Sequence, residues 1–171
     1  MITFPTARPQ RPADQLSPTH HTAARTLTDV LGTGSATSVP DLLGGLDLSG
    51  SERTWRRLPA ASDADVELWL ITWPVGTSTG WHDHGSASGA FTTLRGSLTE
   101  YSWNGSVHVR TLAQGSGRHF DASHIHDVAN EGTEPAVSLH AYAPSLPAMT
   151  RYELVRGRLV VTSVEHRGDL W

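Results

Sequence analysis

The chain has 171 residues, of which 37% are hydrophobic and 18% charged, and this profile predicts one globular, turn-rich domain. Its formal net charge is −4 and no run of Lys or Arg occurs, so we expect no nucleic-acid or membrane partner. There is no cysteine, no apolar stretch of membrane-spanning length and no secretory signal pattern, so we expect no disulfides and a cytoplasmic location.

The chain begins with a segment that does not resemble the rest. Residues 1–18 are rich in Pro, Thr and Arg, and we expect them to be disordered or loosely packed. A helix is expected to start near Thr19, after Pro18, and to end at Gly32 and Gly34. The stretch "VPDLLGGLDLSG" predicts another short turn of helix. Residues 19–50 would then form a short helical preamble packed on the main domain.

From residue 51 to residue 171 the pattern changes to strands. Apolar and polar residues alternate in short segments, and the Asn104–Gly105 pair between two of them strongly indicates a hairpin. About nine strands with hairpin spacing, and no alternating helices, predict an all-β antiparallel barrel of the jelly-roll kind. The expected strands are 65–73, three within 90–112, 117–120, 125–130, 136–142, 151–156 and 158–165.

Two histidines stand one residue apart in "GWHDHGSASGAF". Residues i and i+2 of a strand face one side, so His82 and His84 would look into one space, as two metal ligands must. Together with Gly76 and Gly96, their spacing resembles the first motif of the cupin superfamily. The second cupin motif ends in His, three residues, Asn, and "HDVAN" matches it, although its inner Pro-x-Gly is replaced by "DAS". The resemblance implies a cupin barrel and a third ligand, His126.

The first motif departs from the cupin pattern at one position. Where that motif carries a glutamate ligand, this chain has Gly89. Three neutral imidazoles without a carboxylate would leave a divalent metal its full charge, in contrast to the two-histidine, one-carboxylate iron sites. Such a site suits an anionic substrate that binds the metal directly, and a soft thiolate is the natural candidate.

Two longer stretches, "HDHGSASGAFTTLRGSLTE" and "TEPAVSLHAYAP", resemble the cysteine dioxygenase type I family of bacterial type, the thiol dioxygenase branch of the cupins. The resemblance covers about residues 53–156. It implies oxidation of a small thiol to a sulfinate with Fe(II) and O2, both oxygen atoms entering the product. The implied iron ligands are His82, His84 and His126. Mammalian members carry at position 89 a cysteine bonded to the tyrosine, which Gly89 excludes here.

The same resemblance implies catalytic roles for Ser138, His140 and Tyr142, which alternate along one strand and so share a face. Tyr142 would lie near O2 and the substrate carboxylate, with His140 orienting it and Ser138 anchoring His140. The stretch "TWRRLP" resembles the one that supplies a carboxylate-binding arginine. Because neighbours in a strand face oppositely, only one of Arg56 and Arg57 can enter the barrel. The register of Trp55 with the family's aromatic residue favours Arg57.

These residues predict an L-cysteine dioxygenase. The main alternative is a dioxygenase of 3-mercaptopropionate or another small thiol, a branch that resemblance suggests carries glutamine at the place of Arg57. Another alternative is a non-catalytic or differently metallated cupin, since cupins carry many functions. The expected partners are the small thiol and O2, with a monomeric or homodimeric protein.

Overall fold

The computed structural model describes residues 18–31, 38–59 and 65–167, and these contain two helices followed by eleven strands. The helices are α1 (Pro18–Leu31) and α2 (Val39–Leu43). The strands are β1 (Thr54–Leu58), β2 (Glu67–Trp73), β3 (Trp81–His82), β4 (Ser88–Arg95), β5 (Ser97–Trp103), β6 (Val107–Ala113), β7 (Gly117–Phe120), β8 (Ile125–Ala129), β9 (Ala136–Ala143), β10 (Ala148–Val155) and β11 (Arg158–His166).

Both predicted helices are present. The first begins at Pro18, one residue before the predicted start, and ends at Leu31. The second begins after Ser38, whose hydroxyl accepts a hydrogen bond from the Asp41 N–H while the Asp41 carboxylate accepts one from the Ser38 N–H. This reciprocal cap satisfies two donors that a helix start leaves open. Within the described residues, neither helix is long and apolar enough to cross a membrane. Residues 1–17, expected to be loosely packed, lie outside the described part, and the division at residues 18 and 50 stays a prediction.

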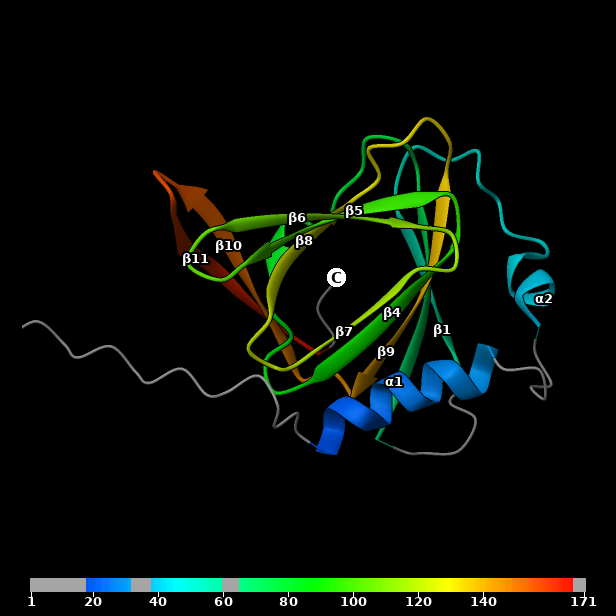
Figure 1. Cartoon of the computed structure of the whole chain (residues 1–171), viewed down its shortest axis with the longest axis horizontal. Coiled ribbons are helices and arrows are strands. Elements are labelled where there is room, and N and C mark those ends of the chain that lie inside the picture. The colour runs from blue at the N-terminus through cyan, green and yellow to red at the C-terminus, as the bar shows by residue number, and fades with distance from the viewer. Residues whose placement is uncertain (1–17, 32–37, 60–64, 168–171) are drawn as a thin grey trace, which may run out of the picture.

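The strands form two antiparallel sheets, which confirms the predicted all-β architecture. One sheet has the order β1-β2-β9-β4-β7 and the other has the order β11-β10-β3-β8-β5-β6. Figure 1 shows the two sheets facing one another, with α1 lying across the outside of the five-stranded sheet. The nine predicted strands are found, and β1 and β3 add to them. β3 has only two residues, Trp81 and His82, too few to produce an alternating pattern.

The core has two parts, one on each side of the five-stranded sheet. Leu68 and Leu70 of β2 face outward and pack in one cluster with Ala23 of α1. Trp73 of the same strand belongs to the second cluster, between the sheets, with Phe91. Strand β9 is buried along its whole length, because α1 covers one face and the barrel interior lies on the other. Alternation therefore sends the odd-numbered β9 residues toward the helix and the even-numbered ones into the barrel.

Candidate metal centre and its cavity

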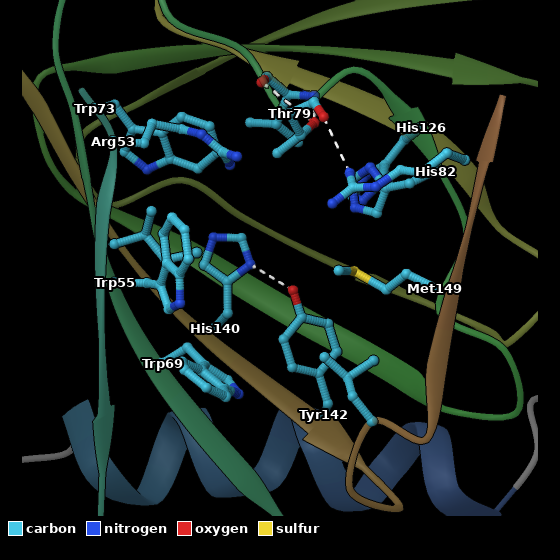
Figure 2. A pocket seen from close by; sticks show the side chains of 14 residues that line it. Arg53, Trp55, Trp69, Trp73, Thr79, His82, His126, His140, Tyr142 and Met149 are labelled. Atoms are coloured by element: carbon cyan, nitrogen blue, oxygen red, sulfur yellow. Dashed lines mark hydrogen bonds between the residues drawn. The ribbon is translucent and has the colours of Figure 1, made fainter. Parts of the chain in front are cut away.

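Three buried histidines converge inside the barrel. His82 of β3 is paired with His126 of β8, and His84 follows β3 directly. One ring nitrogen from each of the three lies within 4.8 Å of one from each of the others. The rings are 4.7–5.0 Å apart between centroids, and all three side chains are buried. Figure 2 shows His82 and His126 side by side at one end of the cavity. The structure thus brings together the three histidines whose spacing predicted a metal site.

The hydrogen bonds of these rings leave nitrogens available for a metal. His82 Nδ1 lies 2.9 Å from the Gly80 carbonyl oxygen, and His126 Nδ1 lies 2.9 Å from the Glu100 carboxylate. Carbonyl and carboxylate oxygens are acceptors, so each Nδ1 donates and each Nε2 keeps its lone pair. Both ring nitrogens of His84 are buried without a hydrogen-bond partner. A buried unpaired polar atom costs about 1–3 kcal/mol, and coordination to a metal would remove that cost.

Burial also sets the charge of these rings. Burial lowers the pKa of His82 to about 4, and the charges of Arg151 and Arg53 add to the effect. Burial holds the pKa of His84 and of His126 well below 6.5, and there repulsion from neighbouring histidines adds to it. The three imidazoles are therefore neutral near pH 7, which is the form that binds a metal. No carboxylate belongs to this group of three. The residues present fit a divalent metal held by histidine alone.

The space of the missing cupin glutamate is filled by a ring. A Cβ added at Gly89 would lie 2.4 Å from Phe120 Cζ and 3.1 Å from Tyr142 Cδ1. The Phe120 ring also stacks on His84, with centroids 4.8 Å apart. Gly89 therefore leaves room for Phe120, and Phe120 in turn supports one of the three histidines. The sequence showed the absence of the glutamate but gave no sign of what replaces it.

Ser138, His140 and Tyr142 form one chain of hydrogen bonds along the inner face of β9. Ser138 Oγ is 2.8 Å from His140 Nε2, and His140 Nδ1 is 3.1 Å from the Tyr142 hydroxyl. Trp73 extends the chain, because its Nε1–H donates to Ser138 Oγ at 2.8 Å. Burial lowers the pKa of His140 to about 3 and raises the pKa of Tyr142, so both groups are neutral near pH 7. The Tyr142 ring lies 5.2 Å from that of His84. The role of Trp73 was missed, since it lies on another strand.

A cavity that is partly open to solvent lies beside these groups. His82, His126, His140 and Tyr142 line it (Figure 2). Most of the remaining wall is apolar and no acidic side chain of the described residues belongs to it. The apolar lining is Trp55, Trp69, Ile71, Trp73, Val128, Leu146 and Met149.

The cavity contains two arginines, and they differ in how they are bound. Arg151 is committed to the protein, since its guanidinium contacts the Glu165 carboxylate at 2.9 Å and the Thr79 carbonyl oxygen at 3.1 Å. Arg53 lies over the rings of Trp73 and Trp55, at 5.2 and 5.9 Å, and has no hydrogen bond or ion pair to another described residue. Burial first, and then the charge of Arg151, lower the pKa of Arg53. An anion in the cavity would relieve both effects.

Arg57, which the sequence favoured for this position, does not reach the cavity. Its side chain is 56% exposed and its guanidinium lies 3.1 Å from the buried Glu67 carboxylate. Arg56 is exposed and does not line the cavity either. The sequence did indicate the correct side of the strand, because Arg53, Trp55 and Arg57 are spaced two residues apart and therefore face the same side. The sequence did not reveal the partner of this arginine: Arg57 is level with Trp69, which lines the cavity, but its guanidinium pairs with Glu67 instead of entering the cavity.

His124 is not part of the group formed by His82, His84 and His126. Its Nε2 lies 2.9 Å from Glu100 Oε1, the oxygen that also accepts from His126. Glu100, His124 and His126 make a second group of ligand-type atoms close enough to hold a metal. Glu100 was not identified from the sequence, because it belongs to no motif and stands 26 residues from His126.

Comparisons with known proteins agree with this geometry. The model of a family described as cysteine dioxygenase type I matches residues 45–154. Among solved structures, an oxalate oxidase in complex with the substrate analogue glycolate is 14% identical with a TM-score of 0.52, over 60% of this chain and 57% of that one. The chain therefore spans little more than half of that protein's length.

A second similar structure is an uncharacterized conserved protein with a double-stranded beta-helix domain from Klebsiella pneumoniae. It is 17% identical with a TM-score of 0.52, over 74% of this chain and 95% of that one. At these identities the likeness shows the fold alone, and it agrees with the predicted all-β jelly-roll architecture.

Proposed function

Because the chain belongs to the cysteine dioxygenase type I family, we propose that it is an Fe(II)-dependent dioxygenase that converts L-cysteine to cysteine sulfinate. In this reaction a thiol and O2 give a sulfinate and one proton. Two sulfur–oxygen bonds form, the O–O bond breaks, and sulfur loses the four electrons that O2 gains. The observation that carries the proposal is the group of three neutral, buried histidines without a carboxylate.

His82, His84 and His126 would hold the iron through their unprotonated nitrogens. When bound, Fe(II) supplies the activation of O2 and the path for electrons from sulfur. Three neutral ligands leave its double positive charge uncompensated, which favours substrates that bind as thiolates. The rings are held in place by the Gly80 carbonyl, the Glu100 carboxylate and the Phe120 ring. This support favours a fixed geometry for the site.

The proposed catalytic line is Tyr142, His140 and Ser138, with Trp73 as its anchor. Each member is hydrogen-bonded to the next one along the line, which orients the Tyr142 hydroxyl at the cavity wall. Because Tyr142 keeps its proton near pH 7, it can donate a hydrogen bond to the substrate carboxylate or to developing negative charge on oxygen. The apolar wall limits water around the reacting groups.

We assign the substrate carboxylate to Arg53 in place of Arg57. Arg53 lines the cavity and has no ion-pair partner among the described residues, whereas Arg57 is paired with Glu67. A guanidinium binds a carboxylate in two-point contact, a geometry that lysine cannot reproduce. Stacking on Trp73 keeps the Arg53 side chain extended along the wall.

One observation favours 3-mercaptopropionate as a second candidate substrate. No acidic side chain of the described residues lines the cavity, so the protein offers no counter-charge to the ammonium group of cysteine. The sequence argument for cysteine depended on Arg57, which lies outside the cavity. Cysteine stays the first candidate because its amine can itself bind the metal, as an uncharged ligand.

Oxygen uptake by protein loaded anaerobically with Fe(II) tests the proposal. We expect thiol-dependent uptake with one sulfinate formed per O2 consumed, and a higher kcat/KM for L-cysteine than for 3-mercaptopropionate. Cysteamine, which lacks the carboxylate, is the matched control and should be much poorer. A higher kcat/KM for 3-mercaptopropionate than for L-cysteine would reject L-cysteine as the substrate, but it would leave the proposed thiol dioxygenase reaction intact. Bound zinc or nickel, with no thiol-dependent uptake after loading with iron, would reject the dioxygenase and favour a differently metallated cupin.

A further inference from the structure

We propose that Glu100 is a positioning residue for the metal centre, which acts on the metal through the ring of His126. The inference rests on the proposed metal centre of His82, His84 and His126. Glu100 would supply the site with a carboxylate, which Gly89 cannot. This carboxylate would contact the ring of His126 and would not bind the metal itself.

Glu100 lies on β5, next to β8, which carries His126. Its side chain is 1% exposed, and Oε1 is 2.9 Å from both His126 Nδ1 and His124 Nε2. Both ring nitrogens donate, since a carboxylate oxygen only accepts. The proton of His126 is therefore held on Nδ1, and its Nε2 keeps the lone pair that a metal needs.

The other carboxylate oxygen has a separate cationic partner. Oε2 of Glu100 is 2.8 Å from Nε of Arg118, which belongs to β7 in the opposite sheet. Removing a carboxylate from water costs several kcal/mol unless it is paired. Arg118 compensates the charge on one oxygen, while the other oxygen stays available to two imidazoles. If Glu100 served only to form an ion pair with Arg118, its second oxygen would not need to contact two histidines.

A carboxylate that accepts the far N–H of a ligating imidazole fixes the orientation of the ring and makes it a stronger donor. This arrangement also argues against a metal ion bound by the second candidate group, which consists of Glu100, His124 and His126. A metal in that second position would need the nitrogen of His126 that now donates to Glu100. His124 then helps to hold Glu100, and the Phe120 ring stacked on it at 5.0 Å links it to the wall behind His84.

The test is the affinity for Co(II), measured by competition with a chelator, together with the visible spectrum of the Co(II) protein. Glu100→Gln keeps an acceptor oxygen but removes the charge, and we expect it to weaken Co(II) binding by about 10–100-fold and to shift the spectrum. Glu67→Gln is the matched control. Glu67 is equally buried and is paired with Arg57 and Arg167, but none of the described histidines is bonded to its carboxylate, so Co(II) affinity should stay within about threefold.

Glu100→Gln leaves Arg118 without its partner, which endangers folding. The double variant Glu100→Gln/Arg118→Met removes both charges, and it should show the same loss of Co(II) affinity, whereas Arg118→Met alone should not. Wild-type affinity and spectrum in a folded Glu100→Gln or double variant would overturn the inference. So would loss of Co(II) binding in His124→Ala but not in His84→Ala. These readouts need no thiol oxidation, so a wild type that binds Co(II) but consumes no O2 would defeat only the proposed function.

Discussion

Replacing Gly89 by alanine tests whether Phe120 occupies the space beside the metal centre. The added Cβ would lie 2.4 Å from Cζ and 2.5 Å from Cε2 of Phe120. Non-bonded carbons rest about 3.5–4.0 Å apart, so the ring must shift by roughly 1 Å. Gly89 has no positive φ, so packing is the only source of strain.

Overpacking of this kind costs about 1–3 kcal/mol, which for a chain of this length lowers Tm by about 2–12 °C. Because the Phe120 ring is stacked on His84, we also expect weaker metal binding. The assay is calorimetric unfolding of Gly89→Ala, Phe120→Leu and the double variant. Shortening Phe120 should relieve the clash, so the double variant should be more stable than the sum of the single effects predicts, by about 0.5–3 kcal/mol. Strict additivity, or an unchanged Tm in Gly89→Ala, would refute the reasoning.

Arg53→Gln should lower kcat/KM for a thiol that carries a carboxylate by about 10–100-fold, because it removes a charge-assisted contact worth about 1.5–3 kcal/mol. The kcat/KM for cysteamine, which has no carboxylate, should not change. Arg57→Gln is the control variant, since Arg57 does not line the cavity. An equal loss in both variants would contradict the assignment. Tyr142→Phe removes the hydroxyl at the end of the line from Ser138, and kcat/KM should fall by about 10–100-fold at unchanged Co(II) affinity; a parallel loss of Co(II) affinity would instead indicate a structural role. Free Co(II) at 100 times its Kd should stabilise the protein by about 2.7 kcal/mol and raise Tm by about 5–10 °C. His84→Ala should abolish that rise, and a rise that persists would place the metal elsewhere.

Features fixed by local sequence periods could be predicted. The two-residue period of strands placed Ser138, His140 and Tyr142 on one face, and the structure shows them hydrogen-bonded to one another. The Asn104–Gly105 hairpin and the cupin spacing of the histidines depend on similarly local rules. Local periods indicated the strands and the shared face of His82 and His84, whereas the third ring, His126, was implied by the resemblance to the second cupin motif.

The site residues that the sequence did not reveal are positioned by contacts between different strands. Arg57 was preferred because Trp55 aligns with the family's aromatic residue, but the Arg57 guanidinium pairs with Glu67 of β2, and Arg53 lines the cavity instead. Glu100 could not be found, because its only signal is a pairing of β5 with β8 that brings it beside His126. Single-strand periodicity gives a face and no position along it.

The most direct measurement is a crystal structure of the iron-loaded protein with an anomalous difference map recorded at the iron edge. The account predicts one peak bonded to nitrogens of His82, His84 and His126, with no oxygen of Asp or Glu among its ligands. A peak bonded to Glu100 and His124, or rings of the three histidines turned away from a common point, would contradict it.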